Sequence, residues 1–405
     1  MPVRIILLTQ WFDPEPTFKG LVFARELVNR GFDVEVITGF PNYPGGKLYP
    51  GYRQKIIQRE IIEGVHITRV PLYPSHDKSS ARRALNYISF AVSSLIYGLF
   101  IARRANVIYA YHPPLTVGVV AALLRFFRRT PIVYDIQDMW PDTLQATGML
   151  NNTRILKTID RVCRWVYRRV DRIVVLSPGF KQLLTERGVP AQKIDVIYNW
   201  ADEFSLLNPT GSLPENFPDE KRFRVLFAGN MGKAQALDTV LEAAGLLQAA
   251  DANVVFTLVG NGIEVSALKQ KTNDLKLNNV VFIPAVPMQN VGMLLNAADA
   301  LLVHLRKDPL FKITIPSKTQ AYMAMGKPIL MGVDGDAADI IRVAGAGKVF
   351  PSEDAQRLAA EVLRLASMPR ESLLEMGEKA RHHYQTHLSL QKGLDAFSQI
   401  FQRFA

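Results

Sequence analysis

The chain has 405 residues, of which 48% are hydrophobic and 21% are charged. This length and composition are typical of two or three domains with large apolar cores, which excludes an intrinsically disordered protein. The single cysteine, Cys163, excludes a disulfide framework and a cysteine-ligated zinc cluster.

The positive charge is concentrated in the first half of the chain. Residues 1–200 contain 27 Lys and Arg against 15 Asp and Glu, a net charge of +12, whereas the remainder contains 21 against 22, a net charge of −1. A basic surface can meet nucleic acid, anionic lipid or a phosphorylated substrate. We therefore expect the two halves to meet different partners. The first ten residues hold an apolar run too short for a signal peptide, and we expect a cytoplasmic protein.

The first half begins with a strand–helix–strand pattern. Residues 3–9 and 34–38 are short apolar runs, and residues 21–30 between them have apolar side chains at helical spacing. This order is typical of a βαβ unit in a parallel sheet. Further strands are predicted at residues 107–111, 132–136 and 173–177.

The second half repeats this pattern after a segment, residues 201–221, that is rich in Pro, Gly, Ser and acidic residues and predicts a linker. A helix is predicted at residues 237–250, and a last helix at residues 387–404. Strands are predicted at residues 224–228, 254–260, 280–283, 300–305 and 328–333.

We therefore expect an α/β fold of two tandem Rossmann-like, doubly wound domains that face each other across a cleft. Ligands bind such sheets at the carboxyl ends of the strands. The expected parts are a first domain, a linker, a second domain and a C-terminal helix that can cross back to the first domain, at residues 1–200, 201–221, 222–380 and 381–405.

The segment TIPSKTQAYMAMG, residues 314–326, is the most informative motif. Pro316 is typical of a first helical position, and the preceding Ile315 has no side-chain oxygen that could cap the helix. Uncapped N–H groups, the positive end of a helix and Lys318 together predict an anion site that would suit a diphosphate. An ordinary helix start with a solvated lysine is the alternative.

The segment FAGNMGKAQALD, residues 227–238, follows a predicted strand and precedes a predicted helix. Gly229, Gly232 and Lys233 resemble a phosphate-binding loop, although neither full glycine fingerprint is present. A plain turn between a strand and a helix is the alternative.

Two aspartates and a histidine follow predicted strands of the first half. Asp135 and Asp138 lie in YDIQDMWPDT, where a carboxylate could orient or deprotonate a hydroxyl, or could instead cap a helix or pair with an arginine. His112 is a candidate general base or, alternatively, a structural histidine. No metal-ligand motif such as HExxH is present, and we expect no bound metal.

Two segments of the first half indicate a membrane surface. Residues 84–102 carry no charge and lie between two arginine pairs, but Asn86, Ser89, Ser93 and Tyr97 share one helical face. That face favours a helix in the interface, or packed on its own domain, over a membrane span. Residues 154–172 predict a basic amphipathic helix with Trp165 beside it, for which a core helix with a solvated basic face is the alternative. Its basic stripe consists of Arg154, Lys157, Arg161, Arg164, Arg168 and Arg172.

The order of the motifs resembles that of the GT-B glycosyltransferases of the large retaining family 4. Within this family the chain is similar to bacterial enzymes that add amino-deoxy sugars, such as N-acetylfucosamine, in O-antigen and capsule assembly. The resemblance covers essentially the whole chain. The matching segments are QWFDPEPTFKG, PNYPGG, residues 64–71, YDIQDMWPDTL, FAGNMGKAQALD and IPSKTQAYMAMGKPIL.

The resemblance implies a nucleotide-sugar donor, which we take to be UDP-linked, on the second domain, and an acceptor on the first. It also implies retention of the anomeric configuration, with no essential metal or other cofactor. By position it places Gly20, Asn230, Lys233, Gln235, Ser317, Lys318 and Tyr322 near the donor, with Ile315 and Pro316 beside them. For the acceptor we expect contacts from His112, Asp135 and Trp140.

The chain departs from the pattern of the family at several places. Asn230 and Gln235 stand where the family commonly has Arg and Lys, so the positive charge must come from Lys233, Lys318, Lys312 or Arg306. The two glutamates of the family, the second of which normally holds the ribose, would fall at Ile313 and Ala321. A histidine common in the first domain falls at Gln137, which leaves Asp138 as our candidate to position or deprotonate the acceptor.

These observations predict a peripheral glycosyltransferase on the inner face of the cytoplasmic membrane. It would move an N-acetylated amino-deoxysugar to a lipid-linked saccharide in surface polysaccharide synthesis, by stabilising the departing diphosphate. One alternative is a nucleotide-sugar epimerase or hydrolase of the same architecture, which would turn over donor without an acceptor. Another is a basic scaffold that binds nucleic acid, which would leave both anion-site motifs unexplained.

Overall fold

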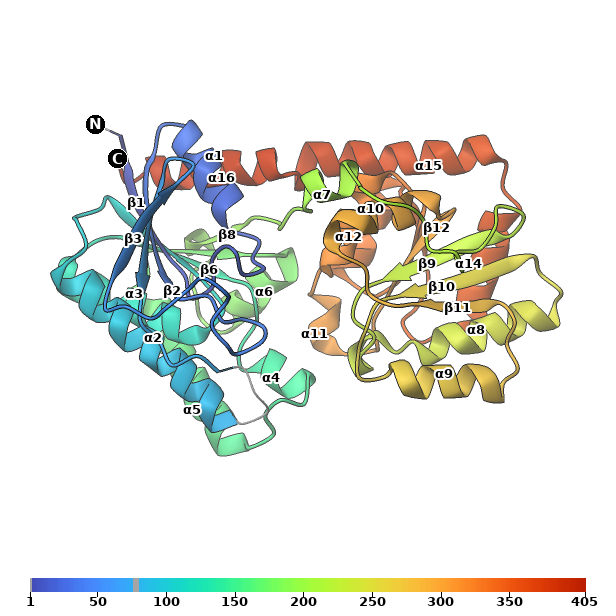
Figure 1. Ribbon diagram of the computed structural model, residues 1–405, viewed down its shortest axis with the longest axis horizontal. Helices are drawn as coiled ribbons and strands as arrows, with labels where there is room; N and C mark the ends of the chain where they lie inside the picture. The colour runs from blue at the N-terminus through green and yellow to red at the C-terminus, as the bar shows by residue number, and fades with distance from the viewer. Residues whose placement is uncertain (1, 76–79) are drawn as a thin grey trace. The chain divides into compact units, whose positions relative to one another are not determined.

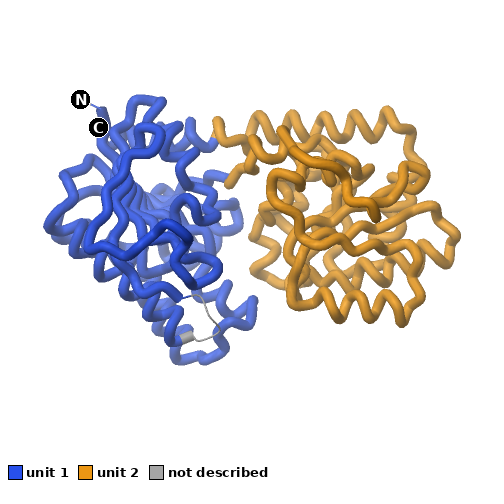
Figure 2. The backbone as a smooth tube through the Cα atoms, viewed as in Figure 1, with its two compact units in different colours: residues 1–198, 393–405 blue, residues 199–392 orange. Residues whose placement is uncertain are grey.

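A computed structural model describes residues 2–75 and 80–405. It divides into two compact units (Figure 2). Unit 1 spans residues 1–198 and 393–405, and unit 2 spans residues 199–392. Residues 201–221, for which a linker was predicted, lie within unit 2, where they include the short helix α7 (Glu203–Leu207).

Unit 1 is built on an eight-stranded sheet with the order β3-β4-β2-β1-β5-β6-β7-β8 (Figure 1). All neighbouring strands are parallel except β3 and β4, which are antiparallel at one edge. The central strands are continuous apolar runs because helices cover both faces of a parallel sheet. The strands are β1 (Arg4–Leu8), β2 (Asp33–Gly39), β3 (Gln58–Ile62), β4 (Val65–Val70), β5 (Val107–Tyr111), β6 (Ile132–Ile136), β7 (Arg172–Val175) and β8 (Ile194–Val196).

Helices cover both faces of this sheet. Helices α2, α3 and α5 lie side by side on one face, and α1 and α16 lie on the other. The helices of unit 1 are α1 (Leu21–Asn29), α2 (Ser80–Phe100), α3 (Leu115–Arg128), α4 (Asp142–Ala146), α5 (Thr153–Arg169) and α6 (Pro178–Glu186), with a 3₁₀ turn at Ala191–Lys193.

The last helix, α16 (Leu390–Gln402), returns to unit 1, as the sequence analysis allowed for the C-terminal helix. The ring of Phe397 lies 5.3 Å from those of Phe23 in α1 and Tyr109 in β5. Arg30 and Asp395 form an ion pair of 2.8 Å at the edge of this contact. The end of the chain therefore completes the core of the unit that the beginning of the chain starts.

Unit 2 has a six-stranded parallel sheet with the doubly wound order β11-β10-β9-β12-β13-β14. The strands are β9 (Phe223–Ala228), β10 (Val254–Val259), β11 (Val280–Ile283), β12 (Ala300–His304), β13 (Ile329–Gly332) and β14 (Gly347–Val349). Helices α8, α9 and α14 cover one face, and α10, α12 and α15 cover the other (Figure 1).

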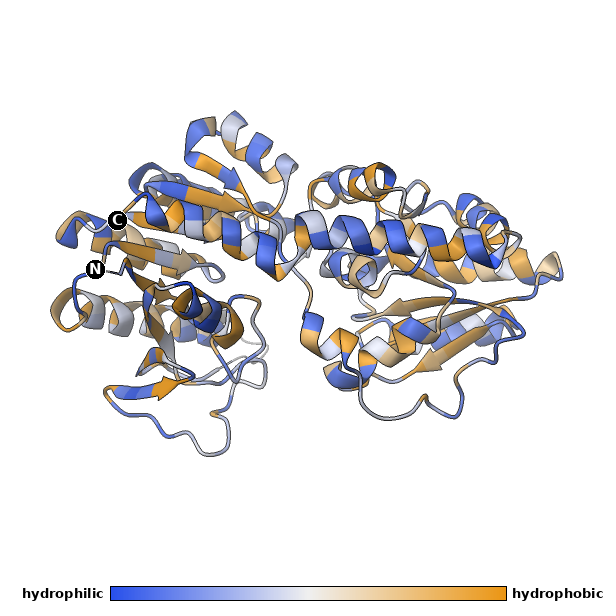
Figure 3. Ribbon diagram, turned by 90° about the horizontal axis from the view of Figure 1, so that it is seen from above, coloured by the Kyte–Doolittle hydropathy of each residue, from blue (hydrophilic) through white to orange (hydrophobic). Residues whose placement is uncertain are grey.

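The helices of unit 2 bury the faces that their apolar spacing predicts. Val240, Leu241 and Ala244 of α8 are fully buried against β9 and β10. Figure 3 shows strands coloured mostly as hydrophobic between helices whose faces are mixed. The remaining helices are α8 (Asp238–Ala249), α9 (Val265–Asp274), α10 (Met288–Ala297), α11 (Pro309–Lys312), α12 (Ser317–Met325), α13 (Asp336–Ala344), α14 (Ala355–Ala366) and α15 (Arg370–His383), with a 3₁₀ turn at Lys233–Gln235 and a π-helical turn at Tyr384–Leu388.

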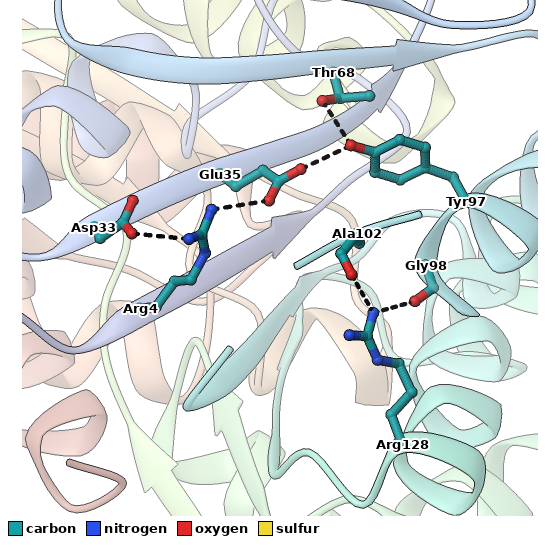
Figure 4. A network of polar contacts seen from close by, with 8 residues as sticks. All are labelled: Arg4, Asp33, Glu35, Thr68, Tyr97, Gly98, Ala102 and Arg128. Carbon is teal, nitrogen blue, oxygen red and sulfur yellow. Dashed lines mark hydrogen bonds and ion pairs between the residues drawn. The ribbon is translucent and has the colours of Figure 1, made fainter. Parts of the chain in front are cut away.

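Helix α2 is fixed to unit 1 through its polar face (Figure 4). The Tyr97 hydroxyl donates to the Glu35 carboxylate at 2.9 Å and lies 3.2 Å from the Thr68 hydroxyl. At the other end of this face, the Asn86 amide donates to the Tyr73 carbonyl at 2.7 Å. The Arg128 side chain donates to the carbonyls of Gly98 and Ala102 at the end of the helix. Residues 84–102 therefore pack on their own domain.

The opposite face of α2 is apolar and exposed. Its side chains recur every three or four residues, the spacing of one helical face. We call them the apolar ridge: Leu85, Ile88, Val92, Ile96 and Phe100. A helix on a soluble domain normally turns its apolar stripe inward, whereas α2 exposes the apolar ridge and also buries Phe90 and Tyr97. Within the described parts of the chain, no helix is both long and apolar enough to cross a membrane.

Candidate functional site

The first candidate site lies in unit 2, where the loop after β9 meets the start of α12. A Cβ atom on Gly229 would lie 2.9 Å from the Lys318 ammonium, which places Lys318 directly against this loop. The Lys318 ammonium also lies 4.5 Å from the centre of the Phe227 ring. Burial lowers the pKa of Lys318 to about 8. The two predicted anion-binding motifs therefore lie against each other.

The start of α12 is open, although it begins one residue later than predicted. Pro316 is the N-cap residue, because its ψ of 136° is extended, and Ser317 is the first helical residue. No side chain caps this end, so the predicted uncapped helix start is confirmed. Ile315 is buried and Ser317 is exposed. Backbone N–H groups at such an end, beside a lysine, are suited to an anion.

Tyr322 holds the helix against the loop rather than projecting toward a ligand. Its side chain is buried, and its hydroxyl accepts a hydrogen bond of 2.9 Å from the Ala228 N–H. This contact positions α12 relative to the end of β9. We therefore assign Tyr322 a positioning role in the anion site.

Two glycines that were not predicted, Gly260 and Gly262, pack against the backbone of the loop after β9. A Cβ atom on Gly260 would lie 2.0 Å from the Gly229 carbonyl oxygen, and one on Gly262 would lie 2.2 Å from that of Met231. Their φ angles of +140° and +158° also favour glycine. The run Gly-Asn-Gly directly after the apolar strand β10 could have predicted this close approach from the sequence.

Gln235 and His304 form hydrogen bonds that fix the end of this loop, residues 232–235. The Gln235 side-chain oxygen accepts from the Gly232 N–H at 3.0 Å, while its backbone carbonyl lies 2.7 Å from His304 Nδ1. Because His304 Nε2 accepts from the Glu353 N–H at 3.2 Å, Nδ1 carries the proton. Burial lowers the pKa of His304, so the ring is neutral and serves as a bridge.

The other predicted donor residues differ in their surroundings. Lys233, Lys312 and Asn230 are exposed. Arg306 donates its backbone N–H to the Ala234 carbonyl at 2.8 Å, and its guanidinium lies 3.4 Å from Asp308. Lys318 is thus the predicted cation that the loop encloses most closely.

The second candidate site lies in unit 1, at the carboxyl ends of β1, β5 and β6. Gly20, predicted from the resemblance, precedes α1 and is in contact with Asp13. A Cβ atom on Gly20 would lie 2.2 Å from a carboxylate oxygen that accepts the Leu21 N–H at 2.5 Å. Asp13 therefore caps α1, and Gly20 is needed for that close approach.

Asp135 is a structural carboxylate, which corrects its predicted role as an acceptor contact. It is fully buried and lies 3.6 Å from the ammonium of Lys19, which is also fully buried. Its oxygens accept from the Tyr109 hydroxyl at 2.5 Å and the Gln137 amide at 2.6 Å. Because its oxygens are occupied and out of reach of solvent, it cannot contact an acceptor directly. A buried lysine carries no signal in sequence, so Lys19 was missed.

His112 is also buried, and its surroundings disfavour the protonated ring. Only 1% of the residue is exposed, and burial lowers its pKa to about 3. Its ring lies edge-on to that of Trp140 at 5.7 Å, so the structure brings these two predicted residues together. Trp140 is half-buried and remains a candidate acceptor contact.

Asp138 has the surroundings of an available carboxylate. It is half-buried, and within the described residues its carboxylate has no hydrogen-bond or ion-pair partner. It does not cap α4, whose N-cap residue is Pro141. Burial raises its pKa from the usual aspartate value. A carboxylate of raised pKa is a stronger base once it is ionised, so Asp138 fits its predicted role. Among the described residues, no group of three or more His, Cys, Asp or Glu side chains is placed to hold a metal.

Two domain families match the chain in tandem. The Glycosyl transferase 4-like domain matches residues 21–200, and the Glycosyl transferases group 1 family matches residues 212–383. Among curated relatives, WbjE of Pseudomonas aeruginosa, described as a probable glycosyltransferase, is 27% identical over 72% of the chain and 74% of its own length. WcaI of Escherichia coli, named for glycosyl transfer in colanic acid biosynthesis, is 28% identical over 80% of the chain and 82% of its own length.

Solved structures share the fold at low sequence identity. HepE of Anabaena, solved in complex with UDP, is 15% identical, covers 99% of the chain and 100% of its own, and has a TM-score of 0.70. WaaG, a glycosyltransferase involved in lipopolysaccharide biosynthesis, is 15% identical and has a TM-score of 0.64. The match covers 98% of the chain and 99% of WaaG. The α/β fold of two tandem Rossmann-like domains is the GT-B fold, as expected.

Proposed function

We propose that this chain, a two-domain glycosyltransferase of the GT-B type, transfers a sugar from a nucleotide diphosphate donor to a saccharide acceptor. The observation that carries the donor assignment is the contact between Lys318 and Gly229 at the open start of α12. In the transition state negative charge builds on the departing diphosphate, and backbone N–H groups with an enclosed ammonium stabilise that charge. HepE, with which the chain shares its fold, was solved with UDP and with UDP-glucose.

A screen of nucleotide sugars by thermal unfolding tests this proposal. A donor present at 100 times its dissociation constant should add about 2.7 kcal/mol to the free energy of unfolding of unit 2. UDP-linked N-acetylated amino-deoxysugars are the donors that we expect to stabilise the protein most. If no nucleotide diphosphate sugar shifts the transition, the donor assignment fails.

Replacing Lys318 with Ala should weaken nucleotide diphosphate binding by about 1.5–3 kcal/mol, the range for a charged hydrogen bond. The ammonium form binds the diphosphate, and the pKa of Lys318 is about 8 in the free protein. Affinity should therefore be full at low pH and fall as the pH rises through 8. Lys318→Arg should remove this fall because arginine stays charged. Titration calorimetry with UDP across this pH range measures both effects.

Lys269→Ala provides the matched control. Lys269 also lies over a phenylalanine ring of unit 2, 5.8 Å from the centre of Phe282, but it is exposed on α9. Its replacement should leave both the affinity and the pH dependence unchanged. Equal affinities for the wild type and Lys318→Ala would remove Lys318 from the site.

For the acceptor, we propose a lipid-linked saccharide of surface polysaccharide synthesis, with retention of configuration and no metal. The names of WcaI and of AmsK of Erwinia amylovora, which is 24% identical, refer to the biosynthesis of colanic acid and of amylovoran. Product configuration by NMR tests retention, and full activity in EDTA tests the absence of a metal. Donor turnover that is equally fast without any acceptor would favour a hydrolase or epimerase instead.

The arrangement of α2 supports a peripheral position on an anionic membrane. The apolar ridge faces outward because the polar face of the helix is bonded to the domain. Two members of the predicted basic stripe are paired with carboxylates instead: Arg164 of α5 with Asp160, and Arg172, which belongs to β7 rather than to α5, with Asp195. The basic row that remains exposed consists of Arg154, Lys157, Arg161 and Arg168.

We expect wild-type protein to sediment with anionic vesicles at low salt and to be released only partly at high salt. Each basic residue near an anionic surface contributes roughly 1 kcal/mol, and this attraction is screened beyond about 8 Å at physiological salt. Neutralising Lys157, Arg161 and Arg168 should abolish the salt-sensitive part. Ile88→Ser with Val92→Ser should abolish the salt-resistant part, because insertion of apolar side chains is not screened.

Val343→Ser serves as the control for the ridge variants, since Val343 is 79% exposed on unit 2. It should leave vesicle binding unchanged. A wild-type protein that stays in the supernatant at low salt would rule out the membrane proposal.

A further inference from the structure

Two aromatic rings of unit 1 form a rigid pair at the end of β1. The rings of Trp11 and Tyr43 are stacked with their centres 4.4 Å apart and their planes 24° from parallel. They come from two different loops, and both side chains are only half-buried. Part of each ring therefore remains available to a ligand.

A buried carboxylate holds the two loops together beneath these rings. The Glu15 carboxylate accepts from the N–H groups of Asn42 and Tyr43, both at 2.7 Å, and from that of Phe12 at 3.3 Å. Burial raises the pKa of Glu15 to about 7, and these N–H donors oppose that rise. Glu15 thus fixes the backbone beside each ring.

A second set of buried hydrogen bonds ties the pair to α2. The Gln10 amide donates to the Asn86 side chain at 2.6 Å, and Asn86 donates to the Asn42 side chain at 3.2 Å. All three residues are buried. A buried polar network that supports exposed aromatic rings rigidifies them in one arrangement, as binding sites require.

The candidate catalytic residue lies at the same edge of the sheet as this pair, because Trp11, Tyr43 and Asp138 follow the carboxyl ends of the parallel strands β1, β2 and β6. After burial, the charge of Asp138 is the next cause that raises the pKa of the Tyr43 phenol, and that charge also raises the pKa of Tyr111. The available carboxylate of Asp138 therefore shares this edge of the sheet with the aromatic rings. Aromatic faces pack against the C–H faces of sugar rings, and a carboxylate accepts hydrogen bonds from their hydroxyls.

We infer that Trp11 and Tyr43 form a stacking platform for a sugar ring of the acceptor, which presents a hydroxyl of that ring to Asp138. This inference rests on the proposed function, because it takes the acceptor to be a saccharide. The platform lies against α2, because Asn86 of that helix donates to the side chain of Asn42, the residue before Tyr43. Arg83 lies about one turn earlier on the same helix. A saccharide on the platform would thus lie next to the helix that carries a cationic side chain and the apolar ridge, which suit the phosphate and the lipid of a lipid-linked acceptor.

Saturation-transfer NMR with methyl glycosides of glucose, galactose, fucose and N-acetylglucosamine tests the platform without any nucleotide. At least one glycoside should receive saturation on its ring protons from the wild type. Trp11→Ala and Tyr43→Ala should each weaken this binding about tenfold, and Tyr43→Phe, which keeps the ring, should retain it. Trp165→Ala is the matched control, because Trp165 is a half-buried tryptophan of unit 1 on α5 that stacks on Arg169.

Binding of UDP to unit 2, measured on the same variants, separates this inference from the proposed function. UDP affinity should be unchanged in Trp11→Ala and Tyr43→Ala, and an unchanged circular dichroism spectrum shows that their unit 1 is folded. If one of the two variants fails to fold, glycoside binding by the other variant tests the platform. Glycoside signals that persist in the folded alanine variants, or that are absent from the wild type, would overturn the platform. Loss of UDP binding in the wild type would overturn the donor assignment alone.

Discussion

Asp138→Asn should lower sugar transfer by on the order of 10²-fold or more, the contribution of a well-placed general base, while leaving nucleotide binding intact. The asparagine has nearly the same shape but cannot take the proton of the incoming hydroxyl. Burial raises the pKa of Asp138, so transfer should fall with decreasing pH at a higher pH than an ordinary aspartate would give. This acid limb of the pH–rate profile should disappear in the variant, whose residual rate is measured with donor and acceptor at saturation.

Asp160→Asn is the control for this experiment. Asp160 is an aspartate of unit 1 paired with Arg164 on the surface of α5, at 2.8 Å. Its replacement should leave the profile unchanged. A small loss of transfer in Asp138→Asn, with the fold intact by circular dichroism, would instead indicate that the leaving diphosphate accepts the proton and that Asp138 only orients the acceptor.

Asp135→Ala should destabilise unit 1 by about 3–5 kcal/mol, the cost of removing one partner of a buried ion pair. The fully buried Lys19 ammonium loses its carboxylate, 3.6 Å away, while burial disfavours its charge. The Tyr109 hydroxyl and the Gln137 amide lose the acceptor to which they donate. Urea unfolding, followed with a probe in unit 1, measures the change in the free energy of unfolding.

A double variant distinguishes loss of the pair from loss of packing. Lys19→Met with Asp135→Leu removes both charges and should recover part of the stability, since well-packed apolar side chains can replace a buried pair, while the Tyr109 hydroxyl and the Gln137 amide still lack their acceptor. Asp339→Ala removes an exposed pair with Arg342, which should matter by no more than about 1 kcal/mol. Equal effects of Asp135→Ala and Asp339→Ala would show that the buried pair is not a main support of unit 1.

The sequence predicts the fold well where strands are buried on both faces. Val107–Tyr111 and Ile132–Ile136 have the predicted bounds, because continuous apolar runs between helices leave little choice. The edge strand β3 (Gln58–Ile62) was missed, since its burial alternates between half-buried and exposed and its sequence includes Gln58, Arg59 and Glu60. Apolar periodicity is weakest at the edge of a sheet, where one side has no neighbour.

The candidate sites divide in a similar way. Lys318 was predicted because a helix start, an uncapped end and a lysine can all be recognised from local sequence. Asp135 and His112 were correctly placed at strand ends, but whether such a residue faces solvent or the core depends on neighbours far away in the chain. Lys19 and Glu15 are buried against segments more than 25 residues away, so no local pattern reveals them.

The return of α16 to unit 1 has a consequence for the order in which the protein can fold during its synthesis. The ribosome delivers residues 1–198 first, but Phe397, which packs on Phe23 and Tyr109, belongs to residues 393–405, which are synthesised last. Domains generally fold in the order of synthesis, and incomplete cores expose apolar surface. Unit 1 must therefore wait, with aromatic side chains uncovered, while all of unit 2 is translated. The nascent chain has to be protected over that interval, although its amino-terminal half is already complete in sequence.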